Sequence, residues 1–495
     1  MTSHIAEPRR SRTVGLIPAL WTLGLGLWGL SRQDSVWRDE AATWQVAGRS
    51  AGEIWHMLGQ VDAVHGLYYL LMHVLFEVFG ASTATLRLPS VLAVAVAAAC
   101  VGVIGQRLAG YRAGLGGGLA LGLLPAVQFH LQEGRPYALV LAGAGLSTLL
   151  LVRQLGGRAD GPRAGTWPRW AAYGLLVLVC ALLNWMSLLL LPAHAVTLWW
   201  VRAGRALRLR WAAASAAAVA GVLPLVLFSR GQSDQVSWIP PLTWHMMIGP
   251  GVLLAIGGLG AWLDSRSRRR PGSAGTGRLS AAAVGLPLLA VPQLGLIGLS
   301  LVQPLFLDRY VLFSMLGPAL LIGAALGAGA RALEGRAPRA ARALVPVVVG
   351  VALVAMLPVE LAKRAPGSRV DDVLAVSAEV DRLKGDGDGV LFVPAARRDT
   401  ALVSPDAFAG LADLALERSP VASGTLKGEE AEPDRIRAAV LGRQRVLLVT
   451  DAARVAKPAS AARDRMKLAV LKERFTVVAD EQVRGRRVTV YERKG

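Results

Sequence analysis

Residues 88–106 read LPSVLAVAVAAACVGVIGQ, an uncharged run bounded by Arg87 and Arg107. A helix built from such a run is long enough to cross the ~30 Å hydrocarbon core of a bilayer. Similar runs recur along the chain, which is 53% hydrophobic with a mean hydropathy of +0.44. The sequence therefore predicts a polytopic α-helical membrane protein with about eleven transmembrane helices. These cover residues 14–31, 86–106, 113–130, 136–152, 170–184, 186–201, 211–229, 245–263, 279–303, 310–330 and 342–361.

Residues 65–80 form another apolar segment, which needs a separate decision. The segment is short for a membrane span and carries His65, His73 and Glu77. A charged side chain at the centre of a bilayer costs at least ~2.5–3.5 kcal/mol. We therefore interpret this segment as an amphipathic helix that lies along the membrane interface.

The chain carries a net charge of +20, which in a soluble protein would suggest a nucleic-acid partner. Here the basic residues cluster in short segments between apolar runs, so we expect membrane lipids and no nucleic acid as partners. Cytoplasmic loops of membrane proteins are rich in Arg and Lys, and this rule orients the chain. The Arg-rich segments are residues 8–12, 107–112, 153–169, 202–210, 264–278 and 331–342. The rule thus predicts a cell-membrane protein with a cytoplasmic N-terminus and an extracytoplasmic C-terminus.

The sequence changes character after the last apolar run. We expect residues 1–365 to form the transmembrane domain, with an outer juxtamembrane loop at 32–85. Residues 366–495 alternate between helical and strand patterns, which indicates a small extracytoplasmic α/β domain. The expected helices lie near 371–384, 432–442 and 460–473, and the expected strands at 390–393, 446–450, 475–479 and 487–491.

Short polar motifs occur at the predicted outer ends of the apolar runs. They are WRDE at residues 37–40, DAVHGLYYLLMH at 62–73, LRLPS at 86–90, LQEGRPYAL at 131–139 and DRYVL at 308–312. In this order the motifs resemble those of the C-type (GT-C) membrane glycosyltransferases, in the branch that includes protein O-mannosyltransferases and the lipid A aminoarabinose transferase. The resemblance covers roughly residues 14–320. It departs at His65-Gly66-Leu67, where the family usually has His-Pro-Pro, and the loss of both prolines loosens the backbone there.

The resemblance implies transfer of a sugar from a polyprenyl-phosphate donor to an acceptor hydroxyl, with inversion at the anomeric carbon. It implies that Asp39 is the general base and that Glu40 supports it, a task that suits carboxylates. Arginine suits the departing phosphate because its planar fork matches phosphate oxygens. The phosphate-binding residues implied by the resemblance are Arg135, Arg309, His65, Tyr310 and Tyr137.

Each of these residues also has a simpler interpretation. Asp39 and Glu40 fit a solvated charge pair, Arg135 and Arg309 fit interfacial anchors, and His65 fits a hydrogen-bonded residue on an amphipathic helix. The loop at 230–244 contains Asp234 and Trp238, and its composition is typical both of a mobile lid and of an inert interfacial loop. No cofactor is implied, and no residues have metal-ligand spacing. A divalent cation near Asp39 is compatible with the sequence but is not required.

Two other functions remain as alternatives at this point. A flippase or transporter of lipid-linked sugars would need polar residues within the spans, where His194 is the main ionisable side chain. A non-catalytic cell-envelope assembly protein would leave the acidic and basic motifs replaceable. Under the glycosyltransferase hypothesis, the resemblance favours mannose or a related hexose as the sugar. Protein, glycan and glycolipid acceptors are all compatible with it.

Overall fold

The structure, a computed structural model, describes residues 6–156, 167–232, 239–268 and 279–495. Asp234 and Trp238, the residues expected to form a lid, lie outside these described residues. The chain forms two compact units. We call Met1–Trp28 with Arg87–Glu360 the helical unit, and Gly29–Leu86 with Leu361–Gly495 the loop–sheet unit. The outer loop thus shares its contacts with the C-terminal domain, and each unit is described by itself.

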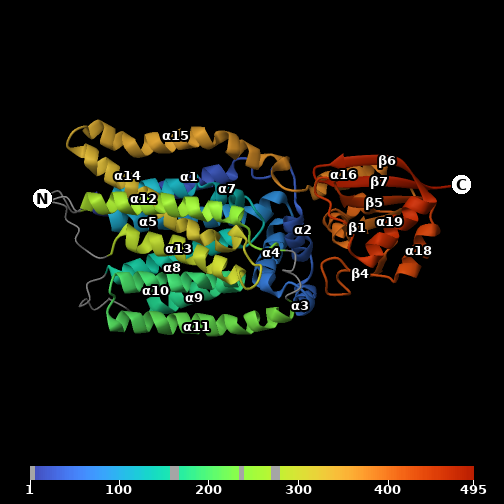
Figure 1. Cartoon of the computed structure of the whole chain (residues 1–495), viewed down its shortest axis with the longest axis horizontal. Coiled ribbons are helices and arrows are strands. Elements are labelled where there is room, and N and C mark those ends of the chain that lie inside the picture. The colour runs from blue at the N-terminus through green and yellow to red at the C-terminus, as the bar shows by residue number, and fades with distance from the viewer. Residues whose placement is uncertain (1–5, 157–166, 233–238, 269–278) are drawn as a thin grey trace. The chain divides into compact units, whose positions relative to one another are not determined.

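Long apolar helices make up most of the helical unit (Figure 1). In the described part of the chain, seven helical segments have the length and hydropathy to cross a membrane. They are formed by α5 (Thr83–Ala109), α8 (Tyr137–Leu155), α11 (Arg205–Ser229), η4 with α12 (Trp244–Met247 and Ile248–Arg268), α13 (Ala281–Ser300), η5 with α14 (Asp308–Met315 and Leu316–Glu334) and α15 (Pro338–Arg364).

The remaining predicted spans correspond to shorter or broken helices. The helices α6 (Tyr111–Leu121) and α7 (Pro125–Leu131) pass the same test as one segment bent by 58°. The shorter apolar segments are Arg12–Leu27 within α1 (Ala6–Leu27), α9 (Trp167–Leu183) and η2 with α10 (Trp185–Leu189 and Leu190–Trp200). Every predicted span therefore coincides with an apolar helical segment, and the predicted polytopic helical fold is confirmed.

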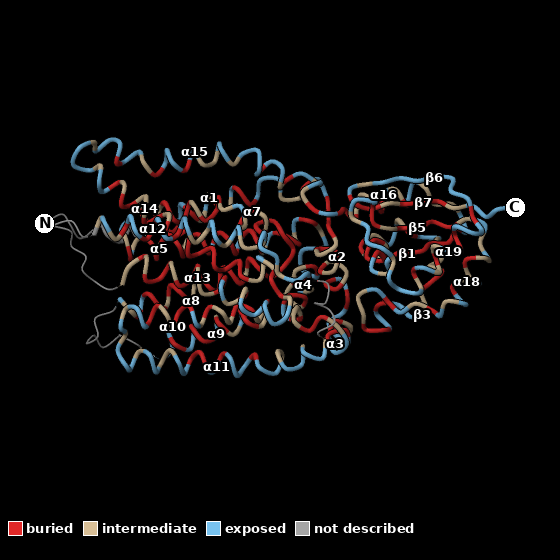
Figure 2. Tube along the Cα trace, in the orientation of Figure 1, coloured by how far each residue is buried: buried red, intermediate tan, exposed pale blue. Residues whose placement is uncertain are grey.

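The exposure of the apolar helices shows which ones face lipid. Only 17% of the most apolar stretch of α12 and of α15 is buried, against 83% for the η5–α14 segment. In Figure 2, α11 and α15 are largely exposed, whereas α5 and α8 are largely buried. Exposed apolar residues such as Leu223 and Val351 would aggregate in water, so their natural surroundings are lipid chains.

Glycines allow the closest approach inside the helical unit. A Cβ atom on Gly323 of α14 would collide with the carbonyl oxygen of Ala113 in α6, and one on Gly117 would lie 2.8 Å from that of Ala319. Larger residues at these positions would push the two helices apart. Small residues at helix contacts are typical of membrane proteins, where van der Waals packing replaces the hydrophobic effect between helices.

The loop–sheet unit contains a five-stranded sheet in the order β2-β1-β5-β7-β6 (Figure 1). The strands β2 (Ala412–Asp413), β1 (Gly389–Val393) and β5 (Arg445–Asp451) are parallel, whereas β7 (Arg486–Arg493) and β6 (Phe475–Val483) are antiparallel to their neighbours. A separate pair joins β3 (Leu416–Arg418) to β4 (Glu429–Glu430).

Side chains of the buried strands alternate between two cores. Val390 and Phe392 pack with α16 (Val373–Leu383) on one face, and Leu391 packs with α18 (Pro433–Leu441) and α19 (Ala462–Arg474) on the other. Helices on both faces of the sheet make the predicted small α/β domain. Between β1 and β5 the chain also forms η7 (Ala395–Arg398), α17 (Asp399–Val403) and η8 (Pro405–Phe408).

The outer loop is also helical. It consists of α2 (Arg38–Ala47), α3 (Ala51–Gln60), η1 (Ala63–His65) and α4 (Gly66–Phe79). The last two form the apolar segment that we interpret as an interfacial helix, and it is too short to count as a span. One face of α4 is buried through Tyr69, Met72 and Phe76, with Phe76 meeting the ring of Trp44 edge-on at 5.5 Å.

Candidate active site

Asp39 and Glu40 lie in the first turn of α2, where carboxylates interact favourably with the helix dipole. Their surroundings differ. Asp39 is half-buried, whereas Glu40 is fully buried and accepts a hydrogen bond from Arg32 Nη2 at 3.0 Å. The acid pair is thus divided into one partly accessible carboxylate and one that an arginine neutralises.

The turn that precedes α2 has an unusual backbone. Arg32, Gln33 and Asp34 have φ angles of 49°, 54° and 54°, a left-handed conformation that non-glycine residues rarely adopt. Asp34 accepts a hydrogen bond from Thr83 Oγ1 at 3.1 Å. Backbone strain of this type persists where surrounding contacts enforce it, and it is common at functional sites. The turn places the Arg32 guanidinium against Glu40.

Asp62, the first residue of the DAVHGLYYLLMH motif, holds the side chain of His65. Asp62 Oδ1 lies 2.7 Å from His65 Nδ1, and Tyr69 donates its hydroxyl hydrogen to Asp62 Oδ2. Asp62 itself has a left-handed φ of 61°. The carboxylate fixes the orientation of the imidazole ring.

Gly66 packs closely against α3. A Cβ atom at this position would lie 2.8 Å from Leu58 Cδ1, which belongs to the core between α3 and α4. A side chain at residue 66 would therefore displace Leu58. The close packing at Gly66 and the Asp62–His65 contact belong to one local arrangement.

In the helical unit, the predicted phosphate-binding residues come from two segments. Tyr137 begins α8, while Arg309 and Tyr310 lie in the first turn of η5. The Arg309 guanidinium lies 5.8 Å from the centre of the Tyr137 ring and 6.0 Å from that of Tyr310, and the two rings are 6.2 Å apart. Asn184 fixes the second segment by donating from Nδ2 to the Tyr310 carbonyl at 3.1 Å. We call Tyr137, Arg309 and Tyr310 the arginine–tyrosine cluster.

The Gln132–Tyr137 segment is anchored through its polar residues. Gln132 Nε2 donates to the carbonyls of Gly26 at 2.8 Å and Trp28 at 2.7 Å, and Ser90 Oγ donates to that of Glu133 at 2.6 Å. The Glu133 carboxylate is paired with His130. Arg135, two residues further on, is buried in this rigid segment.

A cavity of about 380 Å³ opens next to the cluster in the helical unit. His130 connects the two, because it lines the cavity and the centre of its ring lies 5.6 Å from that of the Tyr137 ring. Most of the lining is apolar, which suits a hydrocarbon rather than a free sugar. The lining residues are Ala126, His130, Met246, Gly249, Pro250, Leu253, Gln293, Phe306, Leu307, Asp308, Leu312 and Met315.

The structure therefore gathers the predicted site residues into two groups. Asp39, Glu40 and His65 belong to the loop–sheet unit, and Arg135 with the arginine–tyrosine cluster belongs to the helical unit. Over the described ranges, no group of three His, Cys, Asp or Glu side chains is placed to hold a metal ion. Sequence reasoning did not assign roles to Arg32, Asp62 or Glu133. The spacing of three residues in Asp62–His65 and His130–Glu133 was the available signal.

Comparison with known proteins identifies the fold. No protein-family model matches the chain, and a search of curated protein sequences finds no match. Solved structures do match, among them ArnT and an oligosaccharyltransferase, both GT-C glycosyltransferases. The chain has their GT-C fold, as its motifs indicate.

Two of these structures show how far the likeness extends. ArnT from Cupriavidus metallidurans, bound to undecaprenyl phosphate, has a TM-score of 0.58 at 14% identity over 96% of this chain and 97% of its own. The oligosaccharyltransferase of Archaeoglobus fulgidus, tethered to an acceptor peptide, has a TM-score of 0.54 at 12% identity over 98% of this chain and 74% of its own. The same oligosaccharyltransferase has also been solved with a dolichol-phosphate.

Proposed function

We propose that the protein is a membrane glycosyltransferase that transfers mannose or a related hexose from a polyprenyl-phosphate donor to an acceptor hydroxyl on the extracytoplasmic side. The observation that carries this proposal is the arginine–tyrosine cluster beside an apolar cavity, in a chain with the GT-C fold. A lipid phosphate joins an anionic head to an apolar chain. The cation of the cluster suits the head, and the apolar cavity beside it suits the chain. ArnT, with the same fold, binds undecaprenyl phosphate.

Arg309 and Arg135 bind the donor phosphate in this proposal, with Tyr137, Tyr310 and His65 completing the site. As the bond between the anomeric carbon and the phosphate oxygen breaks, negative charge accumulates on the phosphate. A guanidinium group stabilises that charge most strongly in a site that excludes water. The leaving group is polyprenyl phosphate, and the bonds and charges of this step balance without a metal ion.

Asp39 acts as the general base. It takes the proton of the acceptor hydroxyl while the acceptor oxygen bonds to the anomeric carbon, on the face opposite the phosphate. Of the two adjacent acids, Asp39 suits this role better because Glu40 is fully buried and ion-paired to Arg32. A carboxylate held by a guanidinium is a weak base, so Glu40 supports the position of Asp39. Protein, glycan and glycolipid acceptors all offer the required hydroxyl.

The test uses membranes that contain the protein and polyprenyl-phosphate sugars labelled in the sugar, with mannose offered first. We expect Asp39→Asn to lower transfer by about 10²–10⁴-fold, because the amide cannot accept the proton. The matched control is Asp434→Asn, an exposed position in α18 that should retain full transfer. Undiminished transfer by a well-folded Asp39→Asn variant would remove Asp39 from this role. An inactive wild type with every labelled donor would argue for an assembly protein or flippase.

A further inference from the structure

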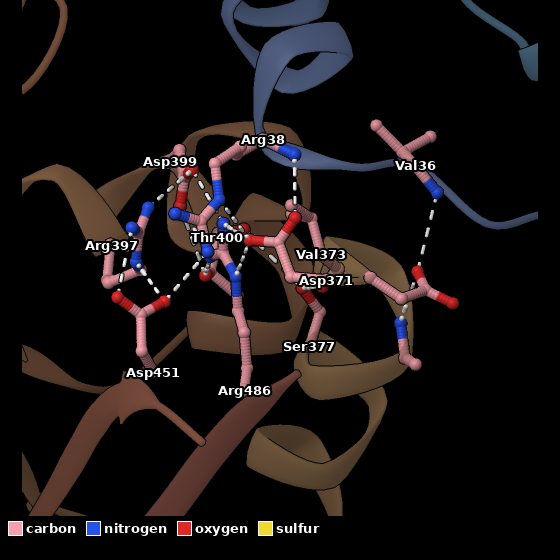
Figure 3. A network of polar contacts seen from close by, with 12 residues as sticks. Val36, Arg38, Asp371, Val373, Ser377, Arg397, Asp399, Thr400, Asp451 and Arg486 are labelled. Carbon is pink, nitrogen blue, oxygen red and sulfur yellow. Dashed lines mark hydrogen bonds and ion pairs between the residues drawn. The ribbon is translucent and has the colours of Figure 1, made fainter. Parts of the chain in front are cut away.

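The segment Val36–Arg38, directly before Asp39, is bound by the C-terminal domain through its backbone. Val373 donates its backbone N–H to the Val36 carbonyl at 2.7 Å, and the Val36 N–H reaches Asp372 Oδ1 at 3.3 Å. The backbone N–H of Arg38 donates to Asp371 Oδ1 at 3.0 Å. These contacts hold both residues that flank Trp37, and Figure 3 shows those made by the N–H groups of Val36 and Arg38.

The side chain of Arg38 enters a network of alternating charges. Its Nε donates to Asp371 Oδ2 at 2.9 Å and its Nη2 donates to Asp451 Oδ1 at 3.0 Å. The same two carboxylates also bind arginines of the domain, because Arg486 contacts Asp371 at 3.0 Å and Arg397 contacts Asp451 at 2.8 Å and 3.1 Å. Figure 3 shows Arg38 placed between these partners.

The network is buried, so the loss of one of its charged hydrogen bonds is costly. Asp371 and Arg486 are almost fully inaccessible, and Arg486 also binds Asp399 through two nitrogens at 2.5 Å and 2.7 Å. Charged hydrogen bonds are worth more than neutral ones, and removal of one partner leaves a buried charge uncompensated. Arg38 is therefore held in one geometry, unlike an exposed arginine at a surface ion pair.

The position of Arg38 in the domain is the one where α/β domains bind ligands. After β1 the chain continues to β2 on one side, and it then reaches β5 on the other side of β1. In open α/β sheets, ligands bind outside the carboxyl ends of the strands at such a reversal. Arg397 follows β1 and Asp451 ends β5, so both contact points of Arg38 lie at this edge.

We propose that the C-terminal domain binds Val36–Arg38 as a built-in ligand, and that Arg38 is the positioning residue for Asp39. The bound segment fixes the residue before α2, so it sets where the first turn of the helix presents its carboxylate. This assigns the C-terminal domain the role of aligning the general base. The effect of Arg38 on catalysis rests on the proposed function, whereas the docking of Val36–Arg38 on the C-terminal domain does not.

The first experiment measures docking without any use of activity. Val36→Cys with Val373→Cys introduces two thiols at positions whose backbones are hydrogen-bonded and whose side chains share a small core. The native Cys100 and Cys180 are buried and do not interfere. We expect rapid disulfide formation in the full-length protein in membranes. Arg38→Met should slow its rate by roughly tenfold or more, because two charged hydrogen bonds are lost.

The second experiment measures transfer kinetics. Misplacement of a base by about 1 Å can lower the rate about 10²-fold, so Arg38→Met should lower kcat by about 10–100-fold with little change in donor KM. Arg38→Lys, which keeps the charge but not the fork, should fall between Arg38→Met and wild type. The surface pair of Arg487 with Asp480 provides a control, and Arg487→Met should leave kcat unchanged.

The introduced disulfide then tests whether Arg38 acts by positioning Asp39 or in some other way. In the Arg38→Met variant, closing the disulfide between positions 36 and 373 should restore most of kcat, because the bond replaces the lost restraint. Unchanged cross-linking and unchanged kcat in Arg38→Met would overturn the proposal, and so would a loss of kcat that the disulfide fails to restore. If the wild type transfers no sugar from any donor, the proposed function fails while the cross-linking rates still decide the docking.

Discussion

Arg32 and Glu40 form a fully buried ion pair at 3.0 Å across the left-handed turn that leads into α2. The pair joins the strained backbone to the acid that neighbours Asp39 in the first turn of the helix. Two charges that are both removed from water must offset a large desolvation cost, so the pair is sensitive to the loss of either member.

Removal of Arg32 alone should destabilise the protein more than removal of the pair. Arg32→Met takes away the guanidinium that neutralises the Glu40 carboxylate, and breaking a buried pair costs ~3–5 kcal/mol. Arg32→Met with Glu40→Leu replaces both charges by apolar groups and should recover much of that loss. Thermal unfolding of the detergent-solubilised protein measures the difference. A double variant less stable than Arg32→Met would contradict this account of the pair.

Asp62 should affect donor binding indirectly, because it orients the His65 ring. Asp62→Asn keeps the shape of the side chain but weakens the charged contact with His65 Nδ1. We expect donor KM to rise about tenfold, in line with the ~1.5–3 kcal/mol of a charged hydrogen bond. The control is His73→Gln, since the His73 ring contacts the Ala47 carbonyl of the same outer loop at 3.1 Å and has no part in the proposed site. A larger effect from His73→Gln than from Asp62→Asn would argue against the assignment.

The arginine–tyrosine cluster predicts two graded effects on donor binding. Arg309→Lys keeps the positive charge but loses the planar fork, so donor KM should rise by about 10-fold or more. Tyr137→Leu removes only the ring that faces Arg309 and should have a smaller effect, near the ~0.5–2 kcal/mol of a cation–π contact. Binding of undecaprenyl phosphate to the purified protein provides the measurement. Equal affinity in all three proteins would exclude Arg309 as a phosphate ligand.

The helices and the main strands were predictable because their signals are local. A run such as residues 88–106 has one stable structure in a bilayer, and the strand at 390–393 is flanked by turn residues. The segment between β1 and β5 was not predicted in detail. Its strands β2 and β4 have two residues each, too few for any periodic pattern. They exist because the sheet edge and Arg398 provide partners, such as Asp413 at 2.6 Å.

The candidate site was predictable only in part, for a related reason. Motif resemblance selected Tyr137, Arg309 and Tyr310, which the structure places in one cluster. Contacts between segments far apart in sequence leave no pattern in a single chain. The Arg38–Asp371 contact joins residues separated by 333 positions, so it required the structure.

The Asp371 network predicts a loss of stability in acid. Burial alone would raise the pKa of Asp371, but the guanidinium groups of Arg486 and Arg38 outweigh burial and lower it. A carboxyl whose pKa is lower in the folded state stabilises that state fully above its ordinary pKa of about 3.9. This contribution is then lost as the pH falls through the lowered value.

Thermal unfolding between pH 7 and pH 3 tests this sign. The wild-type Tm should change little down to about pH 5 and fall below about pH 4, where protons begin to bind the unfolded carboxyl more tightly. Asp371→Asn should be less stable at neutral pH and should lose less on acidification. Asp434→Asn, at an exposed position, should keep the wild-type profile. An identical acid dependence in Asp371→Asn and wild type would show that Asp371 does not contribute.

A substitution of His194 distinguishes the glycosyltransferase hypothesis from that of a proton-coupled transporter. It is fully buried in α10, and both ring nitrogens have partners: Nε2 lies 3.0 Å from Thr148 Oγ1 in α8, and Nδ1 lies 2.8 Å from the Tyr173 hydroxyl in α9. Trp211 Nε1 of α11 donates to the same hydroxyl at 3.0 Å. These contacts tie four helices together, which is a structural role.

His194→Gln should therefore lower Tm and leave sugar transfer within about threefold of wild type. Glutamine reaches fewer partners than imidazole, and a lost buried hydrogen bond costs ~1–3 kcal/mol. A transporter that moves protons through His194 would instead lose all coupled flux, because glutamine does not titrate. Proteoliposomes allow labelled-sugar transfer and proton flux to be measured on the same sample. A proton flux that is present in the wild type and lost in His194→Gln, with an unchanged Tm, would give His194 a functional role and would favour the transport hypothesis.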